Sequence, residues 1–340
     1  MKVLLTGGCG YIGSHVAVVL MSAGHEVFIV DDLSNSRREV VGRIAEIAGR
    51  SPVFYQGDVG EVARVRDIIR RHQIDSVIHL AGFKSVGESV QLPLKYYQNN
   101  VCGTLGLLQA MEAESVSRLV FSSSATIYGD PQYLPVDEAH PQRVINAYGR
   151  SKLHIEDMLR DISASRPSQG VVCLRYFNPV GAHGSGLIGE HPIGIPNNLM
   201  PYVMQVASGE REHLNVFGAD YPTPDGTGVR DYIHVMDLAE GHLAALNFLS
   251  ANCGWHAFNL GTGRGFSVLE MIRAFEKESG RTVPYRITAR REGDVACSYA
   301  DVQAAARELN WKATRSLEDM CSSAWLFQSR LSTDGRSSVG

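Results

Sequence analysis

The 340-residue sequence has no apolar run long enough to cross a membrane and no strongly basic stretch. Its formal charge is 32 − 36 = −4, so we expect no membrane insertion and no nucleic-acid partner. It also lacks close cysteine pairs, because its six cysteines are scattered at positions 9, 102, 173, 253, 297 and 321. Scattered cysteines are typical of reduced thiols, so we expect a cytoplasmic protein without disulfides or a metal site.

Over its first half the sequence alternates short apolar runs with amphipathic stretches. KVLLT (2–6), HEVFIV (25–30) and VVCLRYF (171–177) are typical of buried strands, and IGSHVAVVLMSAG (12–24) of a helix. Regular alternation of strands and helices predicts the α/β class. We therefore expect a doubly wound (Rossmann) parallel sheet with helices on both faces.

After Phe177 the sequence becomes rich in Gly, Pro and Asn and loses its periodicity, which predicts loops and a smaller, irregular second lobe. The strand-like HAFNLG near 256–261 is expected to return to the main sheet. The predicted boundaries are 1–177 with about 231–261 for the first, cofactor-binding lobe, 178–230 with about 262–328 for the second lobe, and 329–340 for a polar, disordered tail.

A glycine-rich turn, LLTGGCGYIGSH, joins the first predicted strand to the first helix. Gly7, Gly10 and Gly13 would let backbone amides approach a pyrophosphate at the positive end of that helix. Asp31 ends the second strand, eighteen residues after Gly13, where a carboxylate can accept both adenosine ribose hydroxyls. Asp31 and Asp32 would repel a 2′-phosphate, so the sequence predicts NAD rather than NADP.

Tyr148 and Lys152, in YGRSK, lie one helical turn apart and therefore on one face of a predicted helix. An isolated pair of this kind is more often a surface pair. An ammonium about 4 Å from a phenolate, at an effective dielectric near 20, would stabilise it by on the order of 4 kcal/mol. That interaction would bring the Tyr148 pKa toward neutrality, where a general base works best.

The glycine loop, SSSAT (122–126) and the Tyr148/Lys152 pair together resemble the extended short-chain dehydrogenase/reductase superfamily. Several stretches are similar to the UDP-glucose (UDP-galactose) 4-epimerases within it: FSSSATIYGD, RYFNPVGAH, GIPNNLMPY, YPTPDGTGVRDYIHVMDLA and RREGD. The resemblance covers residues 1 to about 325. It implies that Tyr148 is the general base, that Lys152 bonds the nicotinamide ribose, and that Ser124 hydrogen-bonds the reacting sugar oxygen.

The resemblance also implies contacts with two ligands, NAD and a UDP-hexose. The expected NAD contacts are Gly7, Gly10, Tyr11, Ile12, Gly13, Asp31, Asp32, Asn35, Ser36, Asp58, Val59, Ala81, Gly82, Lys84, Asn99, Tyr148, Lys152 and Phe177. The expected substrate contacts are Lys84, Ser124, Tyr148, Asn178, Asn198, Leu199, Asn215, Val216, Phe217, Arg230, Arg291, Asp294 and Ser298. Among these, Arg230 and Arg291 can hold a diphosphate by charge-assisted hydrogen bonds.

The residues after Ser124 favour epimerisation over 4,6-dehydration. The related dehydratases carry an Asp-Glu pair there, whereas this chain has Ala125 and Thr126, which cannot titrate. Return of the hydride is then the simplest fate of a 4-keto sugar, and NAD need not leave. Two alternatives stay open: another NAD-dependent enzyme of the superfamily that modifies NDP-sugars, and a non-catalytic NAD-sensing regulator, which would usually lack the Tyr-Lys pair.

Ser298 bears on substrate range. Family members with tyrosine at this position resemble enzymes restricted to glucose and galactose, and those with Cys or Ser resemble enzymes that also take N-acetyl sugars. Because Ser298 leaves room for an acetamido group, we expect activity on UDP-GalNAc and UDP-GlcNAc as well as on UDP-galactose and UDP-glucose. The resemblance further implies a homodimer formed through the helices around 96–113 and 148–163.

Overall fold

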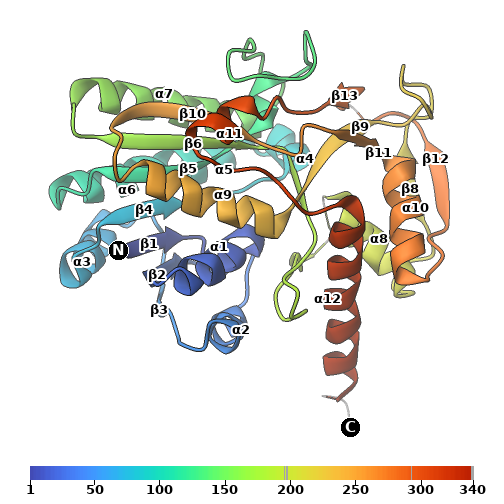
Figure 1. Ribbon diagram of the computed structural model, residues 1–340, viewed down its shortest axis with the longest axis horizontal. Helices are drawn as coiled ribbons and strands as arrows, with labels where there is room; N and C mark the ends of the chain where they lie inside the picture. The colour runs from blue at the N-terminus through green and yellow to red at the C-terminus, as the bar shows by residue number, and fades with distance from the viewer. Residues whose placement is uncertain (195, 197, 292, 338–340) are drawn as a thin grey trace.

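Seven parallel strands form the central sheet, in the order β10–β6–β5–β4–β1–β2–β3 (Figure 1). The computed structural model describes residues 1–194, 196, 198–291 and 293–337, with side chains up to 331. The strands of this sheet are β1 (Lys2–Thr6), β2 (Glu26–Asp31), β3 (Val53–Gln56), β4 (Ser76–His79), β5 (Arg118–Ser124), β6 (Gly170–Tyr176) and β10 (Gly254–Leu260). The predicted doubly wound sheet is confirmed, and β10 does return to it beside β6.

Helices cover both faces of the sheet (Figure 1). One face packs against α1 (Tyr11–Ser22), α2 (Glu39–Ala48), α9 (Val235–Phe248) and α11 (Gln303–Glu308), and the other against α3 (Val62–His72), α6 (Gly103–Ala113) and α7 (Ala147–Ser165). Successive residues of β5 alternate between the two apolar clusters: Leu119 and Phe121 belong to one, and Val120 to the other. Burial on both faces explains why these strands are almost continuously apolar.

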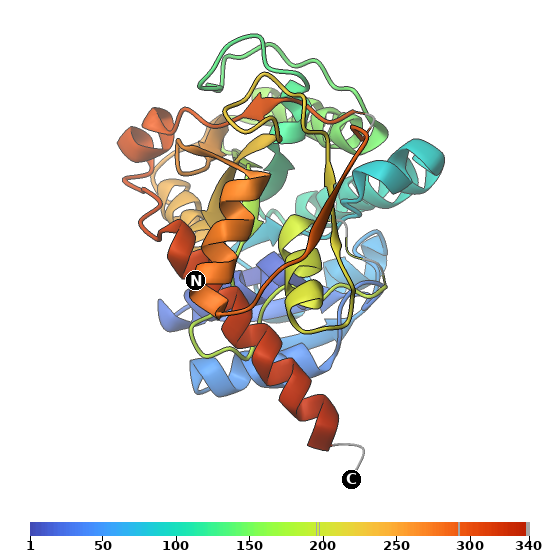
Figure 2. The same cartoon turned by 90° about the vertical axis from the view of Figure 1, so that its right-hand side faces the viewer.

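The second lobe brings together segments that are far apart in the sequence (Figure 2). Helices α8 (Leu199–Ala207), α10 (Val268–Ser279) and α12 (Leu317–Ser337) surround a third apolar cluster. One small sheet contains β7 (Asn178–Val180), β9 (Val229–His234), β11 (Gly265–Ser267) and β13 (Cys297–Ser298), and another pairs β8 (Leu214–Phe217) with β12 (Tyr285–Thr288). Helix α10 begins with a capping box between Ser267 and Glu270 and ends at the left-handed Gly280.

Two segments differ from what the sequence predicts. Residues 329–337, which the sequence predicts to be disordered, continue helix α12 in the structure, where the preceding turn is anchored by the buried Ala324 and Phe327. Residues 338–340 lie outside the described residues. The helix expected around 96–113 is not one regular helix. After α4 (Val86–Gln91) come α5 (Pro93–Tyr96), a π-helical segment (Tyr97–Cys102) and α6. Such π-helical segments are frequent at functional sites.

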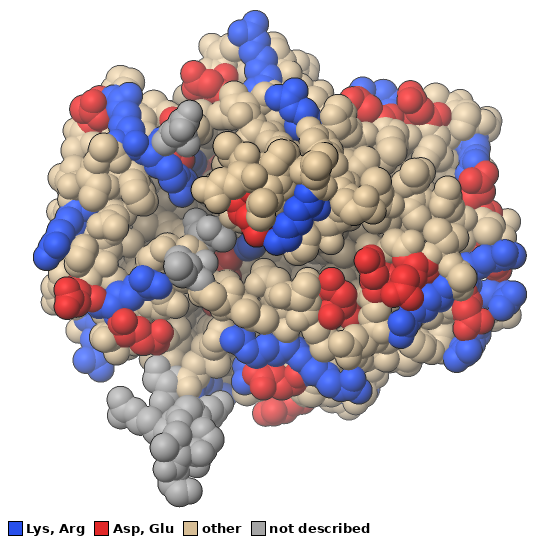
Figure 3. Space-filling model, turned by 180° about the vertical axis from the view of Figure 1, so that it is seen from behind, with Lys and Arg blue, Asp and Glu red and all other residues tan. Residues whose placement is uncertain are grey.

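The surface carries both charge signs. Lys and Arg side chains are interspersed with Asp and Glu on the face that Figure 3 shows. Within the described ranges, no helix has both the length and the apolar character needed to span a membrane. Over the same residues, no cluster of three or more His, Cys, Asp or Glu is arranged to hold a metal ion.

Candidate active site

A cavity of about 1180 Å³ lies at the carboxyl ends of the central strands, with walls from both lobes. In open parallel sheets, ligands bind at this end, where the strand order reverses. In this sheet the reversal falls between β1 and β4. Every residue that the sequence assigns to cofactor or substrate binding lines this cavity. The fold therefore brings all of the predicted site residues together.

The glycine loop between β1 and α1 forms one end of the cavity. Gly7 has φ = +69°, and a Cβ there would lie 2.8 Å from the backbone nitrogen of Ala81. A Cβ on Gly13 would lie 2.2 Å from the carbonyl oxygen of Gly7. Both positions therefore need glycine. The loop leads into the N-terminus of α1, whose first amide groups have no partner within the helix and can bind an anion.

Asp31 ends β2 and is only 7% exposed. Its carboxylate accepts hydrogen bonds from the backbone nitrogens of Cys9 and Leu33, both at 2.9 Å, and from Ser36 Oγ at 2.7 Å. These bonds fix the carboxylate at the edge of the cavity. A carboxylate has about four acceptor positions, so it can accept further bonds from a ribose. Asp32, by contrast, is exposed and accepts from the Ser34 nitrogen.

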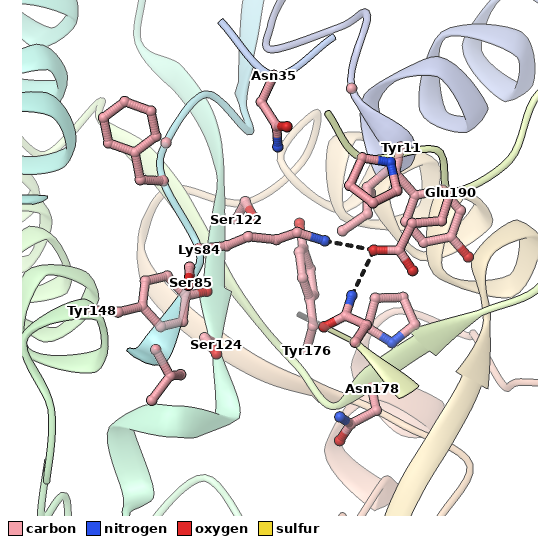
Figure 4. A pocket seen from close by; sticks show the side chains of 18 of the residues that line it. Tyr11, Asn35, Lys84, Ser85, Ser122, Ser124, Tyr148, Tyr176, Asn178 and Glu190 are labelled. Carbon is pink, nitrogen blue, oxygen red and sulfur yellow. Dashed lines mark hydrogen bonds and ion pairs between the residues drawn. The ribbon is translucent and has the colours of Figure 1, made fainter. Parts of the chain in front are cut away.

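Glu190 is a site residue that the motifs missed. It is 8% exposed, and its Oε1 accepts hydrogen bonds from Lys84 Nζ at 2.9 Å and Asn198 Nδ2 at 2.6 Å (Figure 4). On the same side of the cavity, the Tyr11 hydroxyl donates to the carbonyl oxygen of Gly181. Its position in the sequence could have indicated this role. Glu190 is the only charged residue between 178 and 198, and a lone acid in a Gly/Pro-rich segment needs a partner.

Ser124 and Tyr148 reach the cavity from adjacent elements (Figure 4). Ser124 ends β5, and its Oγ accepts hydrogen bonds from the nitrogen and Oγ1 of Thr126 at 3.2 and 2.9 Å. Tyr148 lies in the first turn of α7, which is capped by the Asn146 side chain accepting from the Gly149 nitrogen at 2.8 Å. The strand end and the helix start therefore present two hydroxyl groups to the same space.

Lys152 lies one turn further along α7 but does not pair with the phenol. Its Nζ donates to the carbonyl oxygen of Ser122 at 2.6 Å and lies 6.0 Å from the centre of the Tyr148 ring. Burial lowers the pKa of Lys152 to about 8, opposed by the nearby Glu156 and Cys173. The hydrogen bond recorded for the Lys152 ammonium is therefore to the β5 backbone, and its expected approach to the Tyr148 oxygen stays a prediction.

Tyr148 is half-buried, and its pKa lies above the ordinary value because partial removal from water disfavours the phenolate. A hydrogen bond with Ser124 and the charge of Lys84 lower it in part. The expected lowering by Lys152 is not found, since that ammonium is directed at the β5 backbone. In this arrangement Ser124 and Lys84 are the groups that favour the basic form of Tyr148.

The second lobe contributes a pair of arginines on either side of a carboxylate. Asp294 Oδ1 lies 2.8 Å from Arg291 Nη2 and 4.0 Å from Arg230 Nη2. Two guanidinium groups against one carboxylate leave a net positive charge facing the cavity, which suits a diphosphate. Ser298, in β13, lies beside Arg230 in the parallel pairing with β9 and lines the cavity.

The remaining predicted residues lie at strand ends and helix starts around the same cavity. Asp58 and Val59 follow β3, Ala81 and Gly82 follow β4, Asn99 lies in the π-helical segment, Phe177 follows β6, Asn178 begins β7, Asn198 and Leu199 begin α8, and Asn215, Val216 and Phe217 belong to β8.

Asn100, which the sequence did not single out, fixes the loop after β4: its side chain accepts from the Phe83 nitrogen at 2.8 Å and donates to the Phe83 oxygen at 3.0 Å.

The parallel sheet, the glycine loop and the Ser-Tyr-Lys set define the extended short-chain dehydrogenase/reductase class. A family model described as GDP-mannose 4,6 dehydratase matches residues 4–324. A UDP-glucose 4-epimerase from Bacillus subtilis is 54% identical over 329 residues, which cover 97% of each chain. This chain belongs to the UDP-glucose 4-epimerase family, within the group that the dehydratase model describes.

Solved structures give the same result. A UDP-glucose-4-epimerase from Stenotrophomonas maltophila, with bound NAD and formylated UDP-arabinopyranose, has a TM-score of 0.97 and 51% identity, covering 98% of this chain and 99% of that chain. One from Bifidobacterium longum, in complex with NAD+ and UDP, has a TM-score of 0.94 and 49% identity, with 97% and 98% covered.

Proposed function

We propose that this protein interconverts UDP-galactose and UDP-glucose by inverting C4, with NAD held throughout the cycle. The observation that carries this proposal is the placement of Ser124 and Tyr148 in one cavity with the glycine loop on one side and the arginine pair on the other. The full-length similarity to UDP-glucose 4-epimerases supports the same reaction.

The residues at the β1–α1 end fit NAD. Gly7 and Gly13 leave backbone amides open to a pyrophosphate, because any Cβ there would collide with backbone atoms. Asp31 keeps acceptor positions for the adenosine ribose, and its negative charge disfavours a 2′-phosphate. When bound, NAD supplies an acceptor and later a donor for the hydride of C4.

Tyr148 and Ser124 move and guide the proton. Tyr148 accepts the proton of the C4 hydroxyl as C4 loses its hydride, which leaves a 4-keto sugar. Ser124 accepts two hydrogen bonds from Thr126, so its own O–H, which donates to the Tyr148 oxygen in this structure, can turn to the sugar oxygen when substrate is bound. After the 4-keto sugar rotates within the cavity, the hydride returns to the opposite face of C4 and Tyr148 gives the proton back. No net oxidation occurs, and no further reactant is needed.

Inversion requires a firmly held UDP and a sugar that can turn. Arg230 and Arg291 suit the diphosphate, because guanidinium groups bind phosphate oxygens through directed, charge-assisted bonds. The keto sugar can then rotate about the bonds that link it to the diphosphate. Ala125 and Thr126, which follow Ser124, offer neither an acid nor a base for elimination, so we favour epimerisation although a dehydratase family model matches the chain.

We also propose that UDP-GalNAc and UDP-GlcNAc are substrates. Ser298 lines the cavity next to Arg230, and its small side chain leaves room for an acetamido group. The test incubates purified protein, without added NAD, with UDP-galactose and separately with UDP-GalNAc, and separates the products by chromatography. We expect both to convert, and Ser298→Tyr to lose the second conversion alone.

Each outcome of this test is decisive. Conversion of UDP-galactose without UDP-GalNAc by the unmodified protein would overturn the proposal for N-acetyl sugars and leave the epimerase proposal in place. If neither sugar nucleotide converts, even after NAD is supplied, the epimerase proposal is wrong.

We further propose a homodimer formed through α5, α6 and α7. Leu94 of α5 is 81% exposed and Leu105 of α6 is 45% exposed, so these helices leave apolar side chains open to a partner subunit. Light scattering at micromolar protein should give twice the 37.1 kDa mass of one chain. A mass of 37.1 kDa under those conditions would refute the dimer.

A further inference from the structure

A fully buried ion pair lies directly behind the cavity wall. Arg175 of β6 is 1% exposed and Glu156 of α7 is 0% exposed. The guanidinium binds the carboxylate through two contacts, Nη2 to Oε2 at 2.7 Å and Nε to Oε1 at 3.1 Å. Neither side chain lines the cavity. Buried ion pairs add little stability compared with apolar residues of similar size, so packing alone gives little reason for this one.

The partners of this pair lie on both sides of Ser124. Ser123, the preceding residue of β5, donates its hydroxyl to Glu156 Oε1. Arg175 Nη1 donates to the hydroxyl of Tyr128 at 3.0 Å, and Tyr128 ends the 3₁₀ turn (Ala125–Tyr128) that follows Ser124. The same guanidinium nitrogen also donates to the Glu138 carbonyl oxygen at 3.0 Å. The chain is therefore fastened to the ion pair immediately before and shortly after Ser124.

Glu156 is also one helical turn from Lys152, on the same face of α7. Its negative charge raises the pKa of Lys152 against the larger lowering by burial. The other ionisable groups that face Lys152 are His79 of β4, Cys173 of β6 and Tyr148 of α7. Burial keeps His79 neutral, with a pKa of about 3, and raises the pKa of the Cys173 thiol. Of these groups, only Glu156 carries a negative charge.

We propose that Glu156, held by Arg175, is a positioning residue for the epimerase reaction. Its carboxylate joins the strand end bearing Ser124 to the helix bearing Tyr148 and Lys152. Through one carboxylate it fixes the spacing of the two hydroxyl groups and places a negative charge beside the lysine. This proposal rests on the proposed function, because it assigns a role within that reaction.

The test uses the double variant Glu156→Gln/Arg175→Met, which removes both charges and leaves no unpaired buried ion. We expect it to fold and to retain NAD, with kcat for UDP-galactose lowered tenfold or more and KM within twofold of the unmodified protein. We also expect the alkaline limb of the pH profile of kcat to move down by about one pH unit, because Lys152 loses a neighbouring carboxylate. Glu156→Asp keeps the charge and should keep the limb near its original pH.

A lower kcat with an unchanged pH profile would show that the pair has only a structural role, and an unchanged kcat would refute the proposal entirely. If the double variant does not fold, Ser123→Ala decides the question, because it removes only the hydroxyl that links β5 to Glu156. We expect that variant to keep its NAD and its Tm and to lose several-fold in kcat. Unmodified protein assayed in parallel separates these outcomes from failure of the epimerase proposal itself.

Discussion

Replacing Gly13 with alanine adds one methyl group where helix α1 crosses the glycine loop. The new Cβ would lie 2.2 Å from the carbonyl oxygen of Gly7 and 2.8 Å from the Cα of Gly8. Both are backbone atoms that cannot turn aside, so α1 must move by about 1 Å to restore van der Waals contact. Overpacking of this kind costs about 1–3 kcal/mol. The movement also withdraws the first amides of α1 from the expected pyrophosphate position.

Two measurements follow from this geometry. With an unfolding entropy of about 2.1 cal/mol/K per residue, a 340-residue chain loses about 1.4 °C of Tm for each kcal/mol. We therefore expect Gly13→Ala to lower Tm, measured by circular dichroism, by about 1.5–4 °C. We also expect NAD to bind about tenfold more weakly for each 1.4 kcal/mol of lost contact. The amount of NAD released when the purified protein is denatured should therefore be lower than for the unmodified protein.

Gly42→Ala is the matched control. Gly42 lies inside α2, is exposed, and its added Cβ would meet no atom within 4 Å. Alanine is favoured over glycine in a helix by about 0.5–1 kcal/mol, so the same substitution should here raise Tm by about 1 °C and leave NAD content unchanged. A Gly13→Ala protein with the Tm and the NAD content of the unmodified protein would refute the steric argument.

Three further predictions address the base, acid stability and an ion pair. Tyr148→Phe should lower kcat by about 10²–10⁴-fold without loss of bound NAD; unaltered turnover would exclude Tyr148 as the base. His15 and His79 are buried with pKa values of about 3, so the unfolded chain binds protons below about pH 6.5 that the folded chain does not. As the pH is lowered from 7 to 5, the free energy of unfolding should fall by up to about 1.4 kcal/mol per pH unit for each histidine, and the urea midpoint should fall with it. Equal midpoints at the two pH values would contradict this. Arg315→Met leaves the buried Asp237 without its guanidinium partner and should cost about 1–3 kcal/mol in urea unfolding, with kcat unchanged in the folded protein.

Much of the fold could be predicted from the sequence because it depends on short-range patterns. The apolar runs at 2–6 and 171–177 became β1 and β6 at or within one residue of the predicted bounds, since strands buried on both faces must be continuously apolar. The glycines of the β1–α1 turn and the acid at the end of β2 have fixed spacing, so their place beside one another follows from local structure. Tyr148 and Lys152 share a helix face for the same reason.

The end of the chain shows where local patterns fail. A polar, small-residue composition favours disorder in isolation, yet residues up to Ser337 continue α12. The helix is anchored by apolar side chains such as Phe327, which is buried just before the sequence becomes polar. Whether a marginal segment is helical depends on packing more than on its own propensity.

Short-range sequence patterns predict most elements of the central sheet, the loop expected to receive a pyrophosphate and the candidate residues for the chemistry, because those properties depend on residues a few positions apart. Which buried polar groups meet depends instead on how distant elements pack together. Lys84 binds Glu190 from the other lobe, Lys152 turns to the Ser122 carbonyl rather than to Tyr148, and Arg175 of β6 pairs with Glu156 of α7. A polar group removed from water takes whichever partner the packed elements place beside it, and no short-range pattern specifies that partner.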